Sequence, residues 1–269
     1  MVRSLLMAKL TIVIPALVPT ISMKLLFEFS KLSDIGFLCL TNNPNFPYYF
    51  GRGSERGLEP EKELDYIYKV NYINAPDKGF PEAFFYKGIA NIPENDFILR
   101  LDSDELISLG DIIRIKDLVN LKTQANVFSF ERLWVKKKGA NWYYNQQAKS
   151  KVTNLETQIR LFRKCSVSED NRIHTSGFQT SERILTTGMQ ILHLIYTQAS
   201  FLSRVKKIID YEKINSGSGL SKIRYYLPEI LFSPWERLNQ QSIELLDLWE
   251  LNADRRDKNA AKRILGNFV

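Results

Sequence analysis

The stretch Asp96-Phe97-Ile98-Leu99-Arg100-Leu101-Asp102-Ser103-Asp104-Glu105 joins an apolar run to a group of acidic side chains. Four of the five residues from Phe97 to Leu101 are large and apolar, which predicts a short buried strand. Three carboxylates then follow within four residues. Because ligands bind beyond the carboxyl ends of the strands in open α/β sheets, we expect a functional site at this point of the chain.

Two of these carboxylates, Asp102 and Asp104, are separated by a single residue. In an extended chain they would share one face, and Ser103 would point away from it. Neighbouring carboxylates repel each other unless a cation or a proton joins them. Mg²⁺ and Mn²⁺ prefer oxygen ligands and usually complete their shells with substrate phosphates. The pattern leaves two interpretations open, a divalent metal site or a solvated acidic turn before a helix.

The composition sets bounds on the class of protein. A chain of 269 residues, 44% of them hydrophobic, is long enough for one large α/β domain or for one domain with a helical appendage. A net charge of +7 favours anionic partners, such as nucleotide diphosphates, an anionic membrane surface or nucleic acid. The two cysteines, Cys39 and Cys165, cannot form a disulfide framework and suit a reducing compartment. No apolar stretch is long enough to span a bilayer, so we expect a cytoplasmic protein.

The N-terminal part has the pattern of a βαβ unit. Residues Thr11–Ile14 are all β-branched and are followed by Pro15, which predicts a strand. Helical spacing of apolar residues predicts a helix over Ser22–Leu32, and the run Ile35–Leu40 predicts a second strand. A strand, a helix and a strand in about thirty residues imply a parallel sheet. Two further elements are expected, a strand over Tyr68–Ile73 and a helix over Gly79–Ala90.

The second half of the chain begins with strands and ends with helical spacing. Alternation predicts strands over Val127–Val135 and Gln158–Lys164, and His193 lies in a strand-like apolar run. The lysines before Gly139 are expected to form a turn. From Gln198 onward the spacing of apolar residues is helical.

These elements predict an α/β chain in two parts. We expect a main domain over residues 1–212 and a helical C-terminal extension over 213–269. The extension could pack on the domain, dimerise or lie on a membrane surface. Since the positive charge is spread along the chain without a recognised motif, a nucleic-acid-binding module is not expected. The sequence leaves the oligomeric state open.

Four segments resemble motifs of family 2 glycosyltransferases. Leu101–Glu105 is similar to the Leu-Asp-Ala-Asp-Glu signature of a subgroup that contains lipopolysaccharide-core and related sugar transferases. Thr11–Pro15 resembles the opening strand of the family. Arg160–Lys164 resembles the subgroup's Arg-Leu-Phe-Arg-Lys strand, and Ile191–Tyr196 resembles its Ile-x-His-x-x-Tyr motif. The resemblance covers residues 10–212.

The resemblance implies a GT-A fold, in which a mostly parallel, Rossmann-like sheet is flanked by helices. It implies that a sugar is transferred from a nucleoside diphosphate to a hydroxyl acceptor on a glycan or lipid-linked molecule, with inversion of the anomeric centre. It also implies that a divalent metal, Mn²⁺ or Mg²⁺, is held by Asp102, Asp104 and His193. The implied nucleotide-sugar contacts are Pro15, Thr41, Asn43, Lys87, Arg100, Asp102, Ser103, Asp104 and Arg160. Apart from the resemblance, the expected location is the cytoplasm, with peripheral contact at the inner face of the membrane as one possibility for the C-terminal tail.

The chain departs from the family at two positions. Where the family has an Asp that recognises the nucleotide base, the second strand ends here in Thr41. Where the subgroup has Val-His-Glu, this chain has Thr175 in place of the Glu. If that Glu is the general base in relatives, another carboxylate must replace it. Glu182 is our prediction for that base, with Glu169 and Asp170 as alternatives.

Two other functional classes remain open. A metal-dependent nucleotidyl- or phosphotransferase would use the same carboxylates on a similar sheet, and it would bind nucleoside triphosphates instead of diphosphate sugars. The departures at Thr41 and Thr175 also allow a catalytically silent, glycosyltransferase-like domain that binds without turnover. Metal-dependent hydrolysis of a donor would argue against the silent domain.

Overall fold

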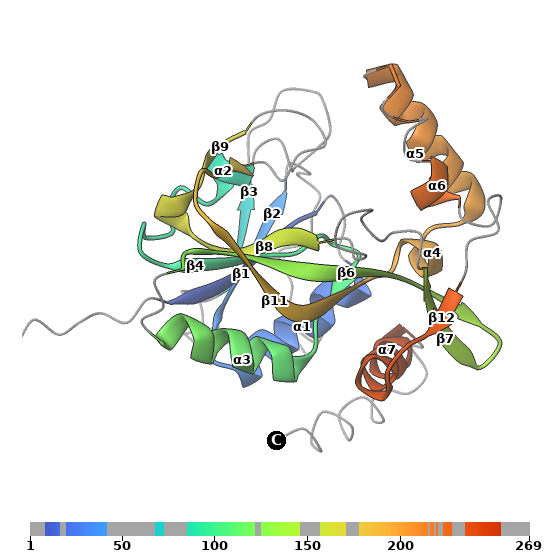
Figure 1. Ribbon diagram of the computed structural model, residues 1–269, viewed down its shortest axis with the longest axis horizontal. Helices are drawn as coiled ribbons and strands as arrows, with labels where there is room; N and C mark the ends of the chain where they lie inside the picture. Colours follow the sequence, from blue (N-terminus) through green and yellow to red (C-terminus); the bar gives the residue numbers. More distant parts are fainter. Residues whose placement is uncertain are drawn as a thin grey trace, which may run out of the picture. The chain divides into compact units, whose positions relative to one another are not determined.

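The computed structural model consists of two compact units (Figure 1). Unit 1 contains Met1–Ser103, Leu109–Ser129 and Ile159–Thr187, and unit 2 contains Asp104–Ser108, Phe130–Gln158 and Gly188–Val269. The structure describes residues 9–16, 20–41, 68–72, 85–121, 125–145, 157–170, 178–214, 216–217, 219, 223–227 and 235–253.

A parallel sheet forms the centre of unit 1. Its parallel strands are β1 (Leu10–Pro15), β2 (Gly36–Thr41), β3 (Tyr68–Tyr72) and β4 (Phe97–Arg100). β1 lies between β2 and β4, and β3 pairs with the other side of β2. β8 (Thr157–Arg163) is antiparallel to β4, with Ile98 opposite Phe162. The predicted α/β class is confirmed, and the strands β1–β4 at the centre of unit 1 are parallel as expected.

Three helices of unit 1 flank this sheet: α1 (Ile21–Leu32), α2 (Phe85–Gly88) and α3 (Leu109–Asn120). α1 and α3 lie on one face of the sheet and α2 on the other (Figure 1). Lys116 of α3 donates a hydrogen bond to the carbonyl of Ser33 at the end of α1, over 2.6 Å. Buried Leu25, Leu26 and Phe29 confirm the predicted helix α1. The helix predicted over 79–90 is described only from residue 85, where α2 begins.

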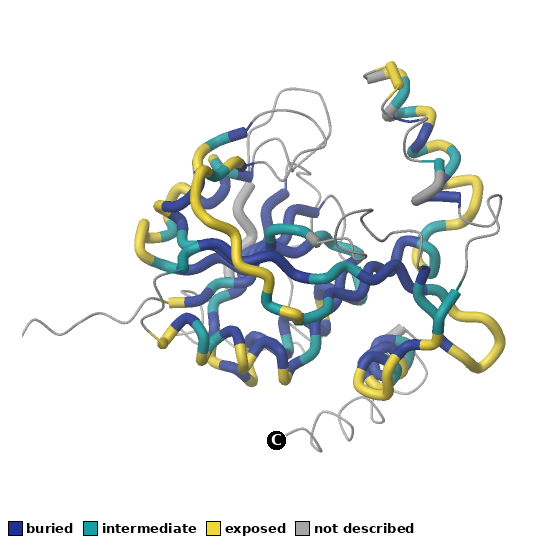
Figure 2. The backbone as a smooth tube through the Cα atoms, viewed as in Figure 1, coloured by how far each residue is buried: buried dark blue, intermediate teal, exposed yellow. Residues whose placement is uncertain are grey.

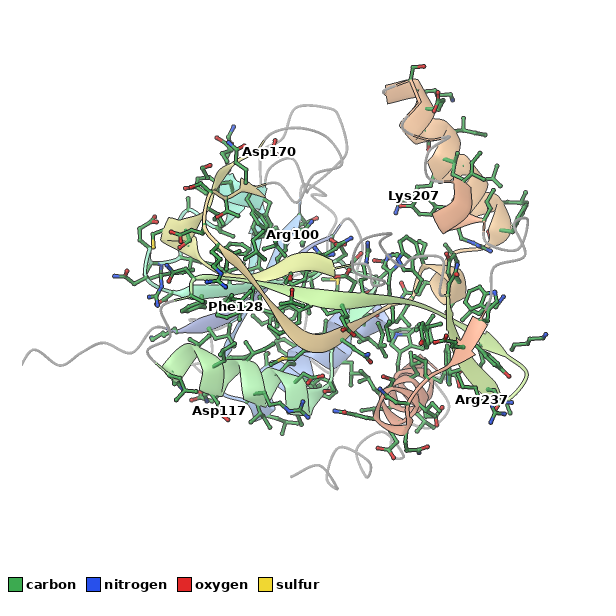
Figure 3. The ribbon with its side chains drawn as sticks, in the orientation of Figure 1. Arg100, Asp117, Phe128, Asp170, Lys207 and Arg237 are labelled. Carbon is green, nitrogen blue, oxygen red and sulfur yellow. The ribbon has the colours of Figure 1, made fainter. Side chains whose placement is uncertain are left out.

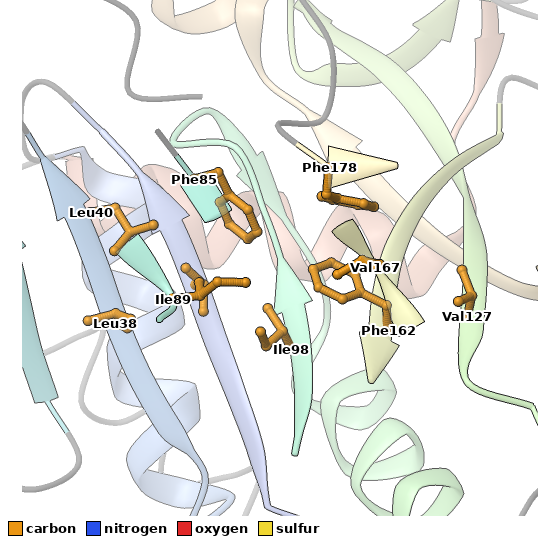
Figure 4. Packing of buried hydrophobic residues seen from close by; sticks show 10 residues of the cluster. Leu38, Leu40, Phe85, Ile89, Ile98, Val127, Phe162, Val167 and Phe178 are labelled. Carbon is orange, nitrogen blue, oxygen red and sulfur yellow. The ribbon is translucent and has the colours of Figure 1, made fainter. Parts of the chain in front are cut away.

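An apolar cluster fills the space between the sheet and α2 (Figure 4). Its buried members are Val13, Leu38, Leu40, Phe85, Ile89, Ile98, Val127, Phe162, Val167 and Phe178. The ring centroid of Phe162 lies 4.3 Å from that of Phe178 and 6.2 Å from that of Phe85. Burying one such side chain stabilises a fold by about 1.5–3 kcal/mol. Cys39 is also buried in unit 1, and its burial raises the pKa of the thiol to about 12.

Shorter elements follow β8: the 3₁₀ turn Lys164–Ser166, β9 (Ser168–Glu169) and β10 (Phe178–Gln179), with β9 and β10 antiparallel. Two long strands, β6 (Val127–Lys138) and β11 (Ile184–His193), each begin in unit 1 and end in unit 2. The first residues of β11 are exposed and its last three are buried (Figure 2).

Unit 2 contains a hairpin and several helices. β6 turns at Gly139, where φ is 61°, into β7 (Asn141–Asn145), and β12 (Trp235–Arg237) is antiparallel to β7. β6 continues through Lys138, so the turn predicted over 136–139 is confirmed at Gly139 and wrong for the three lysines, which belong to the strand. β5 (Glu105–Leu106) pairs with the end of β11. The helices are α4 (Ile195–Gln198), α5 (Phe201–Ile214), α6 (Ile223–Tyr226) and α7 (Gln240–Ala253).

Among the described residues after α5, unit 2 contains the helices α6 and α7 and the short strand β12. Leu246 and Trp249 of α7 are buried, and Trp142 Nε1 donates to Asp247 Oδ1 over 3.2 Å. The predicted helical extension over 213–269 contains α6, α7 and β12, and its boundary stays a prediction. Within the described ranges, no helix combines the length and the apolar character that crossing a membrane requires.

Candidate functional site

The acidic motif begins where β4 ends. β4 stops at Arg100, and the chain turns at Ser103 and Asp104. The expectation that Asp102 and Asp104 lie in one extended segment is therefore wrong. The position of the motif beyond the carboxyl end of a buried parallel strand agrees with the sequence analysis.

Thr20 attaches this turn to α1. Its hydroxyl donates to the carbonyl of Ser103 over 2.6 Å and accepts from the backbone N–H of Met23 over 3.2 Å. The second bond caps the N-terminus of α1, a contribution of about 1 kcal/mol in typical helices. Sequence reasoning missed this residue, although a threonine directly before a helical pattern is a recognised N-cap signal.

In unit 1, the carboxylate of Asp102 lies between two buried arginines. Oδ1 is 3.1 Å from Nη1 of Arg100, and Oδ2 is 2.8 Å from Nη2 of Arg160. The arginines are 3% and 1% exposed, whereas the Asp102 side chain is 25% exposed. Burying a guanidinium is costly unless its charge is paired, so Asp102 stabilises both cations in this position. A group with two positive charges and one negative charge favours an anionic ligand.

Three of the predicted donor-site residues occupy one edge of the sheet in unit 1. Pro15 ends β1, Thr41 ends β2 and Arg100 ends β4, and all three are buried. Because β1 is parallel to both neighbours, these strand ends lie at the same edge. Figure 3 labels Arg100 among the side chains of this unit. Asn43, predicted beside Thr41, lies outside the described residues.

In unit 2, Asp104 lies against His193 at the end of β11. Oδ2 of Asp104 is 3.3 Å from Nε2 of His193, and the backbone N–H of Leu194 donates to the Asp104 carbonyl over 2.7 Å. The imidazole is 3% exposed, and its Nδ1 makes no hydrogen bond to any residue that the structure describes. Trp134 packs edge to face with this ring, with 4.2 Å between centroids. Unit 2 therefore brings together two of the three predicted metal ligands.

The third carboxylate of the motif, Glu105, has a different partner. It is fully buried and lies 2.8 Å from Nε of Arg132 on β6. The Arg132 guanidinium is also 5.0 Å from the centroid of the Trp134 ring. Sequence analysis gave neither Glu105 nor Arg132 a role, because strand alternation does not reveal a pair between separate elements. The ion pair fixes Glu105 as a structural group.

The strand Arg160–Lys164 combines two roles. Its first residue reaches Asp102, as described above. Its last residue, Lys164, is 5% exposed and donates to the carbonyls of Ala90 and Ile92 over 2.8 and 2.6 Å. Lys164 therefore holds the loop between α2 and β4, and only part of the motif serves the candidate site.

The predicted general base and its alternatives lie in unit 1. Glu182 is exposed, and its carboxylate makes no hydrogen bond or ion pair with the described part of the chain. Asp170 is 7% exposed, and Glu169 is half-buried in β9. Thr175 lies outside the described residues. Lys87, predicted near the diphosphate, is exposed on α2.

The donor groups of the motif fit a divalent cation in part. Asp104 and His193 offer an oxygen and a nitrogen, a combination that Mn²⁺ accepts. Each carboxylate oxygen of Asp102 contacts an arginine. A cation can therefore bind to Asp102 only when these arginines pair with another anion. One intervening residue keeps the Cα atoms of Asp102 and Asp104 within about 7 Å. Across the described ranges, no three His, Cys, Asp or Glu side chains are grouped as a metal site.

Two solved structures are remotely similar to this chain. No protein-family model matches the chain, and no curated protein matches it. The crystal structure of S. aureus TarS 1–349 gives a TM-score of 0.40 at 10% identity, over 93% of this chain and 73% of that chain. The crystal structure of a putative glucose-1-phosphate thymidylyltransferase from Bacillus anthracis, in complex with sucrose, gives a TM-score of 0.28 at 14% identity. The match covers 93% of this chain and 96% of that chain. The functional conclusion rests on the residues of the site.

Proposed function

We propose that this chain is a glycosyltransferase that moves a sugar from a nucleoside diphosphate to a hydroxyl acceptor, with a divalent cation. The observation that carries the proposal is the buried group Arg100–Asp102–Arg160 at the carboxyl edge of the parallel strands. The next carboxylate of the motif, Asp104, is paired with His193. Within unit 1, guanidiniums beside the carboxylate of Asp102 offer donors for a diphosphate and an oxygen ligand for its cation.

Arg100 and Arg160 would bind the diphosphate. A guanidinium presents its donors in a planar fork that matches two phosphate oxygens. Burial and the contact with Asp102 hold both arginines in place before the donor arrives, so little is lost in ordering them. As the arginines turn toward the diphosphate, Asp102 gives up part of its pairing and can ligate a cation. Donor binding and cation binding would therefore be coupled.

The cation, Mn²⁺ or Mg²⁺, would supply Lewis-acid stabilisation of the negative charge that grows on the leaving diphosphate. Asp102, Asp104 and His193 are the proposed ligands. His193 would bind through Nε2, the nitrogen that faces Asp104. The edge contact with Trp134 keeps the imidazole in this orientation. An imidazole ligand favours Mn²⁺ over Mg²⁺.

The proposed transfer is a direct displacement that inverts the anomeric centre. The acceptor oxygen forms a bond to the anomeric carbon while the bond from that carbon to the diphosphate oxygen breaks. The nucleoside diphosphate leaves, and the hydroxyl proton passes to a carboxylate of the protein. Glu182 is the proposed acceptor of this proton, and the buried Asp170 and the half-buried Glu169 are the alternatives.

The remaining predicted contacts would place the nucleotide along the strand ends. Pro15 and Thr41 border the edge where the nucleotide base would lie, with Asn43 beside them. Ser103 would contact the donor from the turn, and Lys87 would contact the diphosphate from α2. The acceptor would be a glycan or lipid-linked molecule of the lipopolysaccharide or surface-polysaccharide type. The free thiols of Cys39 and Cys165 suit a reaction in the cytoplasm.

Thermal unfolding in the presence of ligands tests this function. The full chain is heated with Mn²⁺ and a panel of nucleoside diphosphates, their sugars and nucleoside triphosphates. A ligand that binds only the folded state raises the Tm as its concentration exceeds the Kd. We expect a Mn²⁺-dependent rise with one nucleoside diphosphate and its sugar, and slow hydrolysis of that sugar nucleotide.

A pair of matched variants separates specific from general effects. Asp104→Asn should abolish the Mn²⁺ dependence, because an amide is a weak substitute for a carboxylate ligand. Asp117→Asn, which changes an exposed carboxylate of α3 (Figure 3), should behave as wild type. Absence of any diphosphate effect in folded wild type would overturn the proposal. A response to triphosphates alone would favour a nucleotidyl- or phosphotransferase, and binding without hydrolysis would favour a silent domain.

A further inference from the structure

One helix of unit 2, α5, leaves large apolar side chains in solvent. Phe201 is 44% exposed, Leu202 is 77% exposed and Ile209 is 47% exposed (Figure 2). Successive residues of a helix are about 100° apart, so these three side chains and Val205 share one face within a quarter to a third of the circumference. Val205 is half-buried. The helical spacing expected from Gln198 onward places Ile208 at the border of this face, and Ile208 alone of these apolar residues is buried.

The contacts of α5 inside unit 2 come from its other side. Arg204 is 5% exposed, and its Nη1 donates to the carbonyl of Tyr226 on α6 over 2.6 Å. Nζ of Lys207, labelled in Figure 3, lies 5.3 Å from the centroid of the Tyr226 ring. Ile208 is buried on the same side. These contacts attach α5 to α6 without using the exposed apolar face.

Positive charge borders the exposed apolar face. Lys206 is one helical turn after Leu202, and Lys213 is one turn after Ile209, and both lysines are exposed. Glu212, seven residues after Val205, lies on the same face near the end of the helix. Its half-buried carboxylate is occupied there, because it accepts from the backbone N–H groups of Gly217 over 2.6 Å and Gly219 over 3.0 Å. The remaining acidic residue of the helix, Asp210, is half-buried. Around the helix axis it is farther from the apolar face than Lys206 and Lys213 are.

Other exposed large apolar residues in the described ranges do not gather in this way. Leu32 ends α1, Ile113 lies in α3 and Leu121 follows α3, and none of them has another exposed large apolar residue within one helical turn. Ile184 and Leu185 are consecutive in β11, so they point to opposite faces of the strand. Single exposed apolar residues are normal on protein surfaces, whereas a gathered set indicates a partner.

We propose that this face of α5, formed by Phe201, Leu202, Val205 and Ile209 and bordered by Lys206 and Lys213, binds the surface of an anionic lipid bilayer. A helix with Phe and Leu on one side and lysines beside them lies in the plane of the interface, with the rings and aliphatic chains below the headgroups. The lysines then meet anionic headgroups. A second copy of the chain fits less well, because a two-fold contact would bring the lysines of both copies together. This inference does not depend on the donor site.

Vesicle sedimentation tests the proposal. The full chain is mixed with vesicles of phosphatidylcholine alone, or of equal parts phosphatidylcholine and phosphatidylglycerol. We expect binding to the anionic vesicles that weakens with added salt, because salt screens the attraction between lysines and headgroups. Leu202→Glu should lower the affinity about tenfold or more, since it removes a buried apolar contact and adds a repelled charge.

The matched control is Leu121→Glu, which changes a 63% exposed leucine of unit 1 in the same way and should bind as wild type. The Tm of Leu202→Glu, measured by circular dichroism, and its response to nucleotides should equal those of wild type. Failure of the membrane proposal can therefore be distinguished from failure of the proposed function. The proposal is overturned if wild type does not sediment with anionic vesicles, or if Leu202→Glu and Leu121→Glu bind equally. It is also overturned if size-exclusion chromatography shows a dimer that Leu202→Glu dissociates, which would assign the face to self-association.

Discussion

Asp102 and Asp104 are two residues apart, yet they have different surroundings. In unit 1, Asp102 lies between two buried guanidiniums, at 3.1 and 2.8 Å. In unit 2, Asp104 lies 3.3 Å from an imidazole that packs against an aromatic ring. An Asp-x-Asp motif is therefore not a symmetrical pair of ligands. One carboxylate organises the cations that would receive the donor, and the other pairs with a group that can itself bind metal.

The strongest test of this difference is Asp102→Asn. A carboxylate accepts hydrogen bonds on both oxygens, whereas the amide would direct an NH₂ group toward one of the buried arginines. Removing the charge also leaves both guanidiniums without this counter-ion, so we expect a loss of about 3 kcal/mol in the free energy of unfolding. Urea unfolding monitored by circular dichroism measures it. A loss no larger than that of Asp117→Asn would show that Asp102 does not stabilise the arginines.

The arginine side of the same cluster is tested by Arg160→Lys. The ammonium keeps the charge but loses the planar fork, so the affinity for the nucleoside diphosphate should fall about tenfold, or about 1.4 kcal/mol. Titration calorimetry at fixed Mn²⁺ measures this change. Arg163→Lys is the control, because Arg163 lies in the same strand and bonds to Asn126 and to the carbonyl of Asn95. Equal losses in both variants would contradict a donor-binding role for Arg160.

Thr20→Val tests how the turn is held in unit 1. The variant keeps the shape of the side chain and removes the hydroxyl that bonds Ser103 and caps α1. We expect a loss of about 1 kcal/mol in the free energy of unfolding, the usual cost of a lost N-cap. Thr20→Ser retains the hydroxyl and should recover most of that loss. If the two variants unfold alike in urea, the hydroxyl does not anchor the turn.

The smallest effect on stability is expected for Asp104→Asn. Its described partner, His193, can donate to an amide oxygen as well as to a carboxylate. We therefore expect the free energy of unfolding to fall by less than about 1 kcal/mol. The Mn²⁺ response proposed above should be lost. A destabilisation as large as that of Asp102→Asn would remove the contrast between the two carboxylates.

The sequence predicted the elements whose signals are local. The β-branched run of β1, the apolar run of β4 and the helical spacing of α1 each lie within one segment, and the structure confirms all three. Their order also implied the parallel sheet. Two parallel neighbouring strands need a crossover connection, and the helix between them provides it. The place of the motif at a strand end follows from the same pattern.

The sequence did not predict the contacts between segments. The partners of Glu105 and Asp102 are Arg132 and Arg160, and no periodicity links positions so distant in the chain. An acidic turn at Ser103 was one of the two interpretations left open, and the sequence could not choose between it and an extended Asp-x-Asp segment. β12 was missed because three residues, Trp235–Arg237, are too few to show alternation, and hydrogen bonding to β7 defines the strand.

The buried position of Lys164 has a consequence for how this chain diverges from its relatives. Lys164 holds the carbonyls of Ala90 and Ile92, whereas the first residue of the same five-residue motif serves Asp102. In a lineage that changes its donor, substitutions are expected at Arg160 while Lys164 persists. In a lineage that reshapes the loop over 90–94, Lys164 is expected to be replaced together with that loop. The two ends of one motif are therefore constrained by different contacts.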